Sequence, residues 1–245
     1  MIQDKLSSDN CFFCDNNKFY QVKKLEEISS KFYETSEIYG NEHGMTSFDD
    51  IYGAKIWKTY QEEVIPLIKL AKKIKATAIC FTGSSNLPYD AIFKLSNNTL
   101  QKIECVTTID GYLGDLEHEV YKRGEVVLRG PHTGSDGFCK SYGITGTKIN
   151  RKMRGYNANN EDPEDNMINT ERYCVQDMKR IQKKFSKKYK GCWLLVTTDH
   201  ILAPYENEFL SGIKKSIRNA FNNPFEKIFL CNKDIGKEFI EQIFN

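Results

Sequence analysis

The sequence lacks any long apolar run. No stretch approaches the roughly 18 consecutive apolar residues that a membrane-spanning helix needs, so we expect no membrane partner. The first residues, Met-Ile-Gln-Asp-Lys, are polar or charged where a secretory signal would be apolar. These two absences predict a cytoplasmic protein.

The sequence also lacks a strong excess of one charge. Its formal net charge is only +2, so the field of the whole molecule does not predict an acidic partner. The case for nucleic acid therefore depends on local clusters of lysine and arginine. For any one cluster, a solvated outer face is the alternative interpretation.

Cysteine is present, but the sequence lacks a disulfide or zinc framework. Several of the eight cysteines sit inside apolar runs, as Cys80 and Cys105 do, and there we expect free buried thiols. Cys11 and Cys14 have the spacing of half a structural zinc site. No second Cys-x-x-Cys or His pair completes it, so we do not expect zinc unless the fold brings in a distant ligand such as Cys139, His132 or His43.

Motifs of several common enzyme classes are missing. No G-x-S-x-G segment accompanies the four scattered histidines, which excludes the usual serine hydrolase pattern. The segment 143–148 contains two glycines and Lys148 but lacks the Walker spacing and a strand leading into it. We therefore expect neither a hydrolase triad nor a P-loop ATPase.

What is present is a folded α/β pattern, with 40% hydrophobic, 12% aromatic and 28% charged residues. Helical spacing predicts helices, and short apolar runs bounded by turn residues predict strands. Strands joined by tight turns favour antiparallel pairing and strands separated by helices favour parallel pairing, so we expect a central mixed β-sheet flanked by helices. The expected helices span 18–39, 47–75 with a kink or split at Pro66, 115–123, 170–188, 206–221 and 235–244, and the expected strands span 78–81, 89–95, 100–109, 125–128, 192–197 and 227–231.

We divide the chain into an N-terminal helical extension, residues 1–46, and an α/β core, residues 47–245. The core contains a long insert at about 129–168 that is rich in Gly, Ser, Thr, Asn and Asp. This insert also carries cations, which contact phosphates, and aromatic rings, which stack on bases. The residues that we expect to bind nucleic acid are Lys140, Lys148, Arg151, Lys152, Arg154 and Tyr156.

Two carboxylates are candidates for the chemistry. Asp90 lies on the second expected strand and Glu104 lies in the middle of the third, so antiparallel pairing can bring them side by side. A carboxylate within an apolar strand is costly unless a partner or a cation compensates. Two such groups suit Mg²⁺, which prefers a few carboxylates together with waters and a substrate phosphate. The alternative is an exposed sheet surface on which Lys94 and Lys102 pair with the two acids.

The segments Pro88-Tyr89-Asp90 and Glu104-Cys105-Val106, set in the order helix, three strands, helix, strand, resemble the PD-(D/E)XK nuclease superfamily. The resemblance implies a restriction-endonuclease-like core and cleavage of nucleic acid, with DNA favoured over RNA, in the presence of Mg²⁺ or Mn²⁺. Asp90 and Glu104 would bind the metal, and Glu62 or Glu63 on the preceding helix would assist. By analogy with nucleases that cut both strands, it also suggests a homodimer.

The sequence departs from that pattern at two points. Val106 stands where the superfamily has its lysine, and Tyr89 separates Pro88 from Asp90. Lys102, which shares a strand face with Glu104, and Lys148 from the insert are the candidates to replace the catalytic lysine; Lys94 shares a face with Asp90 in the same way. Glu117 or Glu119 would be a further metal ligand. If no lysine reaches the site, the alternative is an inactive module that binds nucleic acid or protein.

Overall fold

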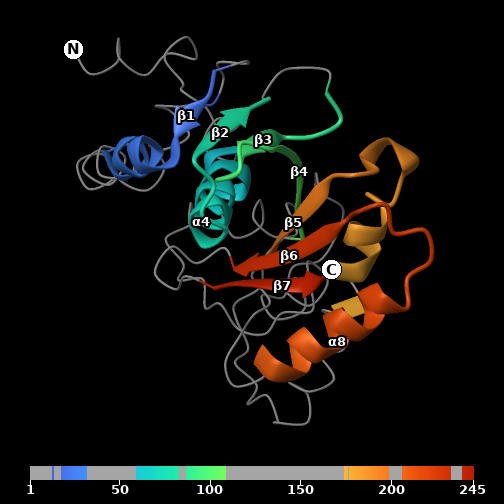
Figure 1. The fold of residues 1–245 in the computed structure, drawn as a ribbon. Helices are drawn as coiled ribbons and strands as arrows, with labels where there is room; N and C mark the ends of the chain where they lie inside the picture. Colours follow the sequence, from blue (N-terminus) through green and yellow to red (C-terminus); the bar gives the residue numbers. More distant parts are fainter. Residues whose placement is uncertain are drawn as a thin grey trace, which may run out of the picture.

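The computed structural model describes residues 13, 18–31, 59–82, 87–108, 174–175, 177–198, 206–232 and 239–245. These residues form a seven-stranded mixed sheet with helices packed on both faces (Figure 1). The α/β class and the mixed sheet expected from the sequence are thereby confirmed.

The strands lie side by side in the order in which they occur in the chain. From β1 to β4 the pairing is antiparallel, β4, β5 and β6 are parallel, and β7 is antiparallel to β6. A tight turn at Asn98, whose φ is 64°, joins β3 to β4, whereas α8 lies between β5 and β6. The strands are β1 (Tyr20–Gln21), β2 (Ala78–Phe81), β3 (Ala91–Lys94), β4 (Leu100–Thr107), β5 (Trp193–Thr198), β6 (Lys227–Asn232) and β7 (Ile240–Phe244).

One face of the sheet is covered by helical residues 22–31, by a π-helical turn η3 (Tyr60–Val64) and by α4 (Ile65–Lys73). Pro66 lies in the first turn of α4, where its missing N–H leaves no hydrogen bond unmade. The break expected at Pro66 is thus a change of helix type, from π to α, one residue before the proline.

The opposite face is covered by the helical residues 174–175 and 177–182, by the 3₁₀ turn η4 (Lys187–Tyr189) and by α8 (Glu206–Arg218), which lies next to β7 in Figure 1. Side chains of β5 alternate between the two cores, and all six of its residues are buried. The expected central strand at 192–197 is therefore present, shifted by one residue.

Two expected helices differ from the structure. The C-terminal helix at 235–244 was wrong, because residues 240–244 form β7, which pairs with the edge of β6 and contains a β-bulge. The helix expected to run to Lys188 ends at residue 182, and Val175, expected on its buried stripe, is 55% exposed. In both cases tertiary packing outweighs the local spacing.

The described N-terminal residues pack on the same core as the rest. Tyr20–Gln21 pairs with β2, and Leu25 is fully buried beneath α4 residues in the same cluster. The five cysteines in the described part of the chain are free thiols, as expected. The expected elements at 115–123 and 125–128 and the insert at 129–168 lie outside the described residues.

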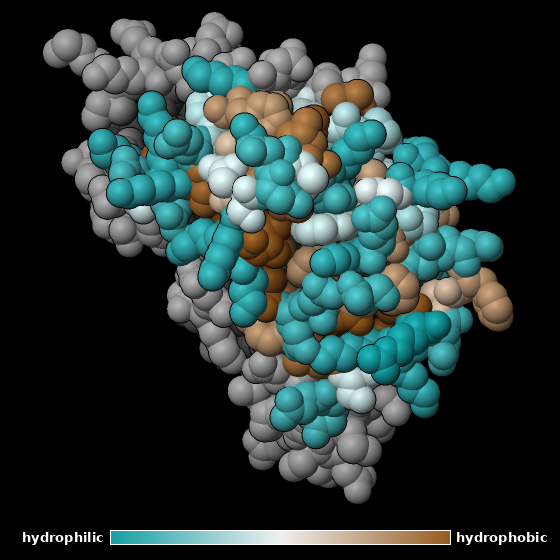
Figure 2. All heavy atoms as spheres, in the orientation of Figure 1, coloured by the Kyte–Doolittle hydropathy of each residue, from teal (hydrophilic) through white to brown (hydrophobic). Residues whose placement is uncertain are grey.

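The surface seen in Figure 2 is mostly hydrophilic, with hydrophobic atoms visible in a band between hydrophilic side chains. Among the helices that the structure describes, none is long and apolar enough to span a membrane.

Candidate active site

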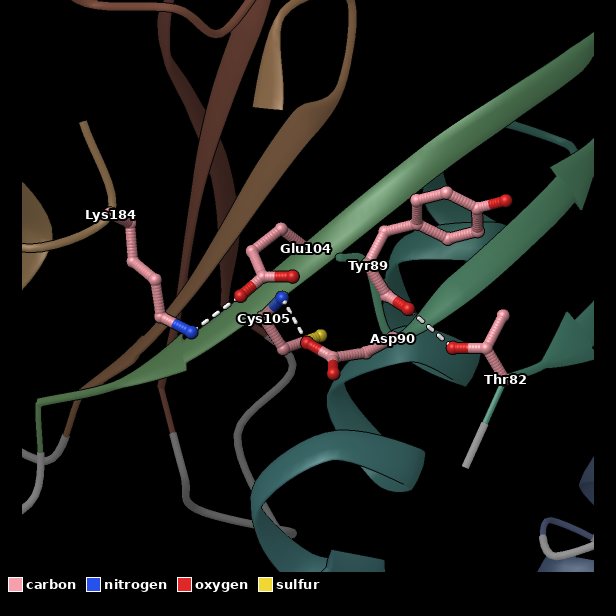
Figure 3. A network of polar contacts seen from close by, with 6 residues as sticks. All are labelled: Thr82, Tyr89, Asp90, Glu104, Cys105 and Lys184. Atoms are coloured by element: carbon pink, nitrogen blue, oxygen red, sulfur yellow. Dashed lines mark hydrogen bonds and ion pairs between the residues drawn. The ribbon is translucent and has the colours of Figure 1, made fainter. Parts of the chain in front are cut away.

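Asp90 lies at the point where β3 begins. Its main-chain N–H donates to the Ile103 carbonyl and its carbonyl accepts from the Thr82 N–H, both at 2.9 Å, so the residue is fixed between β2 and β4. Its Oδ2 accepts from the main-chain N–H of Cys105 at 2.7 Å (Figure 3). The Asp90 carboxylate therefore takes the place beside β4 that a main-chain carbonyl of a longer β3 would occupy.

Glu104 lies close to Asp90. β3 and β4 pair Ala91 with Ile103, and the Asp90 N–H donates to the same Ile103 carbonyl, so Asp90 lies beside Ile103 and Glu104 where the pairing ends. The two carboxyl groups interact electrostatically, because the charge of Asp90 raises the pKa of Glu104. Two carboxylates that share a buried site disfavour carrying two full charges at once unless a cation is present.

Lys184 is the counter-ion of Glu104. Its Nζ forms an ion pair with Glu104 Oε1, and the Glu104 side chain is only 4% exposed (Figure 3). The alternative in which the two acids sit on an exposed sheet surface with Lys94 and Lys102 is therefore wrong for Glu104. Lys184 Nζ also lies 5.9 Å from the centroid of the Tyr189 ring, which is buried and stacked on Phe225 with centroids 5.6 Å apart.

Glu63 brings a third carboxyl group from η3. Burial raises its pKa to about 7, and the charges of Asp90, Glu62 and Glu104 raise it further while Lys184 lowers it. Charges are weakly screened in a protein interior, and η3 packs against β4, so Glu63 interacts electrostatically with the Asp90–Glu104 pair from the helix layer. A π-helical turn is rare, and such turns occur frequently at functional sites.

The carboxyl groups are held in an environment that disfavours their charged forms. Burial raises the pKa of Asp90, against the opposing effects of the Cys105 N–H and Lys184. Burial and then the charge of Asp90 raise the pKa of Glu104 to about 6, against the opposing hydrogen bonds of Lys184 and Tyr189. Burial lowers the pKa of Lys184, but the hydrogen bond and charge of Glu104 outweigh it, so the net shift is upward. Carboxyl groups outnumber ammonium groups here, which is an arrangement suited to a cation.

The other sequence-predicted site residues occupy different positions. Lys102 is exposed, and its Nζ lies 5.2 Å from the centroid of the Tyr89 ring. Lys94 lies at the far end of β3 from Asp90, and Glu62 neighbours Glu63. The remaining candidates fall outside the described residues: Cys11, Cys14, His43, Glu117, Glu119, His132, Cys139, Lys140, Lys148, Arg151, Lys152, Arg154 and Tyr156.

Lys184 was not predicted as a site residue. It belongs to the lysine-rich segment 179–190, whose spacing fits either an extension of the nucleic-acid-facing surface or a solvated outer face. A signal was available in the spacing. Asp177 and Ile181 are fully buried, and Lys184 follows them at intervals of four and three residues, which is one face of a helix. The buried stripe of this helix thus leads toward Lys184, which lies in the turn directly after residue 182 and pairs with Glu104 on β4.

No group of three or more His, Cys, Asp or Glu side chains within the described ranges is arranged to hold a metal ion. Asp90 and Glu104 offer two carboxylates, and the ammonium of Lys184 lies against the second of them. Comparisons of this chain with family models, with curated proteins and with solved structures gave no match.

Proposed function

We propose that this chain is a metal-dependent nuclease that hydrolyses phosphodiester bonds of nucleic acid, with DNA favoured over RNA, on a restriction-endonuclease-like core. The order of elements supports this proposal. A helix, η3 with α4, precedes the antiparallel strands β2, β3 and β4, and the helical residues 177–182 lead into β5. Among the described residues, this order supports the resemblance on which the proposal rests.

The observation that carries the proposal is the meeting of Asp90 and Glu104 across β3 and β4. One oxygen of each carboxyl group has a partner, the Cys105 N–H for Asp90 and the Lys184 ammonium for Glu104. Mg²⁺ is commonly bound by one or two carboxylates plus waters and substrate phosphate, so two protein ligands are sufficient. The donor set fits, because the carboxyl oxygens are hard ligands, and burial raises their pKa values by disfavouring a charge that a cation would offset.

Each residue then has a separate part. Asp90 and Glu104 would hold the metal, and Glu63 would accept a proton from a water molecule, because its pKa of about 7 suits a general base near neutral pH. When bound, Mg²⁺ supplies a Lewis acid that lowers the pKa of a water and offsets charge on the phosphate. Lys184 takes the part that the sequence assigned to Lys102 or Lys148, since its ammonium already lies at Glu104 and can turn to a phosphate oxygen.

The test is incubation of the purified chain with plasmid DNA and with RNA in Mg²⁺, Mn²⁺ or EDTA. Asp90→Asn is the informative variant, because an asparagine oxygen can still accept from the Cys105 N–H while the charge is lost. Glu104→Gln does the same for the second ligand. Glu208→Gln, exposed on α8, is the matched control that removes an equal charge far from the pair.

We expect metal-dependent cleavage that is lost in Asp90→Asn and Glu104→Gln and retained in Glu208→Gln. Mn²⁺ binding, followed by titration calorimetry, should weaken in the same two variants. Cleavage that survives in both variants would contradict the assignment of the site. If Mn²⁺ and nucleic acid bind to the wild-type chain without cleavage, the chain is the inactive binding module of the alternative proposal.

A further inference from the structure

The segment that carries Lys184 is strongly basic. Residues 179–192 contain seven lysine or arginine residues and no acidic residue. Lys184 is half-buried against Glu104, whereas the other lysines of residues 183–190 are exposed. The exposed lysines of this segment are Lys183, Lys187, Lys188 and Lys190.

Contacts fix this basic segment beside the carboxyl groups. The Lys184 ion pair holds the segment against Glu104 on β4, and the same Nζ lies 5.9 Å from the centroid of the Tyr189 ring. Lys188 lies over the Tyr189 ring, with its Nζ 4.7 Å from the centroid. The exposed ammonium group of Lys188 and the ammonium group that pairs with Glu104 thus lie beside the same aromatic ring.

Lys102 approaches the same carboxyl groups from β4. It is two residues before Glu104, and side chains two apart on a strand share a face. Its Nζ lies over the ring of Tyr89, which directly precedes Asp90. β4 pairs Ile103 with Trp193 of β5, and the Gln101 side-chain amide donates to the Gly191 carbonyl at 3.0 Å, so Lys102 also lies near the end of the basic segment.

We propose that the exposed lysines Lys102, Lys183, Lys187, Lys188 and Lys190, which we name the lysine rim, bind the phosphate backbone of the nucleic acid whose scissile bond lies at Asp90 and Glu104. This inference rests on the proposed function and specifies where its substrate lies. Figures 1 and 2 have the same orientation. The loop that precedes β5 in Figure 1 lies at an edge of the molecule where Figure 2 shows mainly hydrophilic residues.

Charge complementarity favours a polyphosphate chain as the partner. The carboxyl groups at the centre repel a lone anion, whereas the rim attracts anions on either side of them. A nucleic-acid strand presents phosphates at regular intervals, so phosphates next to the scissile one can lie on the rim. The rim is separate in sequence from the insert residues 129–168, which the sequence analysis proposed as the binding segment.

The test measures binding without cleavage. Fluorescently labelled duplex DNA and single-stranded DNA are titrated with the full chain in EDTA, and anisotropy is followed at several NaCl concentrations. The rim variant is Lys187→Glu/Lys188→Glu, and the matched control is Lys23→Glu/Lys24→Glu, an adjacent exposed pair on helical residues 22–31 with the same change of net charge. Circular dichroism melting shows whether each variant is folded, and Lys102→Glu provides a second rim variant on a different element.

We expect the rim variants to bind about 10-fold to 100-fold more weakly at 0.1 M salt, with a smaller salt dependence, because each lost phosphate contact lowers that slope by about 0.9. The control pair should bind like the wild-type chain. Equal effects of the rim and control pairs, no effect of either, or no binding by the wild-type chain would each overturn the inference. If binding depends on the lysine rim but no metal-dependent cleavage occurs, the proposed function is refuted and the binding role of the rim is not. If cleavage occurs but does not depend on the rim, the binding role of the rim is refuted and the proposed function is not.

Discussion

Replacing Glu63 by glutamine should stabilise the protein at alkaline pH. Glu63 is half-buried and interacts electrostatically with Asp90 and Glu104, and burial together with their charges raises its pKa to about 7. At pH 8 the side chain is ionised in an environment that favours its neutral form. Glutamine has nearly the same shape and no charge, so the substitution removes this penalty and little else.

The size of the effect follows from the pKa. A displacement from 4.5 to about 7 corresponds to about 3 kcal/mol, at about 1.4 kcal/mol for each pH unit. Because the side chain is partly solvated and coupled to its neighbours, we expect about 2 kcal/mol. The group has a raised pKa in the folded state, so its stabilising contribution is present below pH 4.5 and is lost as the pH rises to about 7. The free energy of unfolding of Glu63→Gln should therefore exceed that of the wild-type chain by an amount that grows between pH 5 and pH 8.

The assay is urea unfolding of the wild-type chain, Glu63→Gln and the control Glu208→Gln at both pH values, followed by tryptophan fluorescence and circular dichroism. Excess Mg²⁺ should narrow the gap at pH 8, because a bound cation offsets the charge that the glutamine removes. A difference between Glu63→Gln and the wild-type chain that is the same at pH 5 and pH 8 would refute the reasoning. So would a variant that is less stable than the wild-type chain at pH 8.

Three further predictions concern Lys184, the pH dependence of cleavage and the packing of Gly212. Lys184→Met should slow cleavage by about 100-fold or more while Mn²⁺ still binds in calorimetry, and loss of Mn²⁺ binding would contradict a phosphate-facing role for this ammonium. The rate of cleavage should rise as the pH increases through about 6 to 7, where Glu104 and Glu63 ionise, and a flat profile over this range would contradict the assignment. Gly212→Ala should destabilise the protein by about 1 to 3 kcal/mol in urea unfolding, because the added Cβ would lie 2.8 Å from Cys174 Sγ. This loss of stability should be smaller in a Cys174→Ala background, and additive losses of stability would argue against the contact.

The strand pattern and the carboxyl pair were predictable because both depend on short-range features. Apolar runs closed by Gly, Asn and Pro locate β2, β3 and β4, and the short turn at Asn98 determines their antiparallel pairing. Once Ala91 pairs with Ile103, the next residues on the two strands, Asp90 and Glu104, must lie close together. The sequence therefore contained enough information to bring Asp90 and Glu104 together.

The C-terminal strand was not predictable from the same kind of signal. Ile235, Phe239, Ile240 and Ile243 recur at intervals that also fit one face of a helix. What decides in favour of a strand is the open edge of β6, whose main-chain groups pair with residues 240–244. This is a property of the assembled sheet and not of the segment.

Lys184 was missed for a related reason. A sequence motif fixes how many residues separate two side chains along the chain. An ion pair depends only on where the charged atoms lie in space. Val106 occupies the position in which a lysine was expected on β4, and Lys184 reaches Glu104 from a separate element that lies 80 residues further along the chain. Lysine has a long side chain, so many main-chain positions around a buried carboxylate can deliver an ammonium group to the same point. A search for this site in other sequences should therefore require the carboxyl pair and accept a lysine from any element that packs over β4.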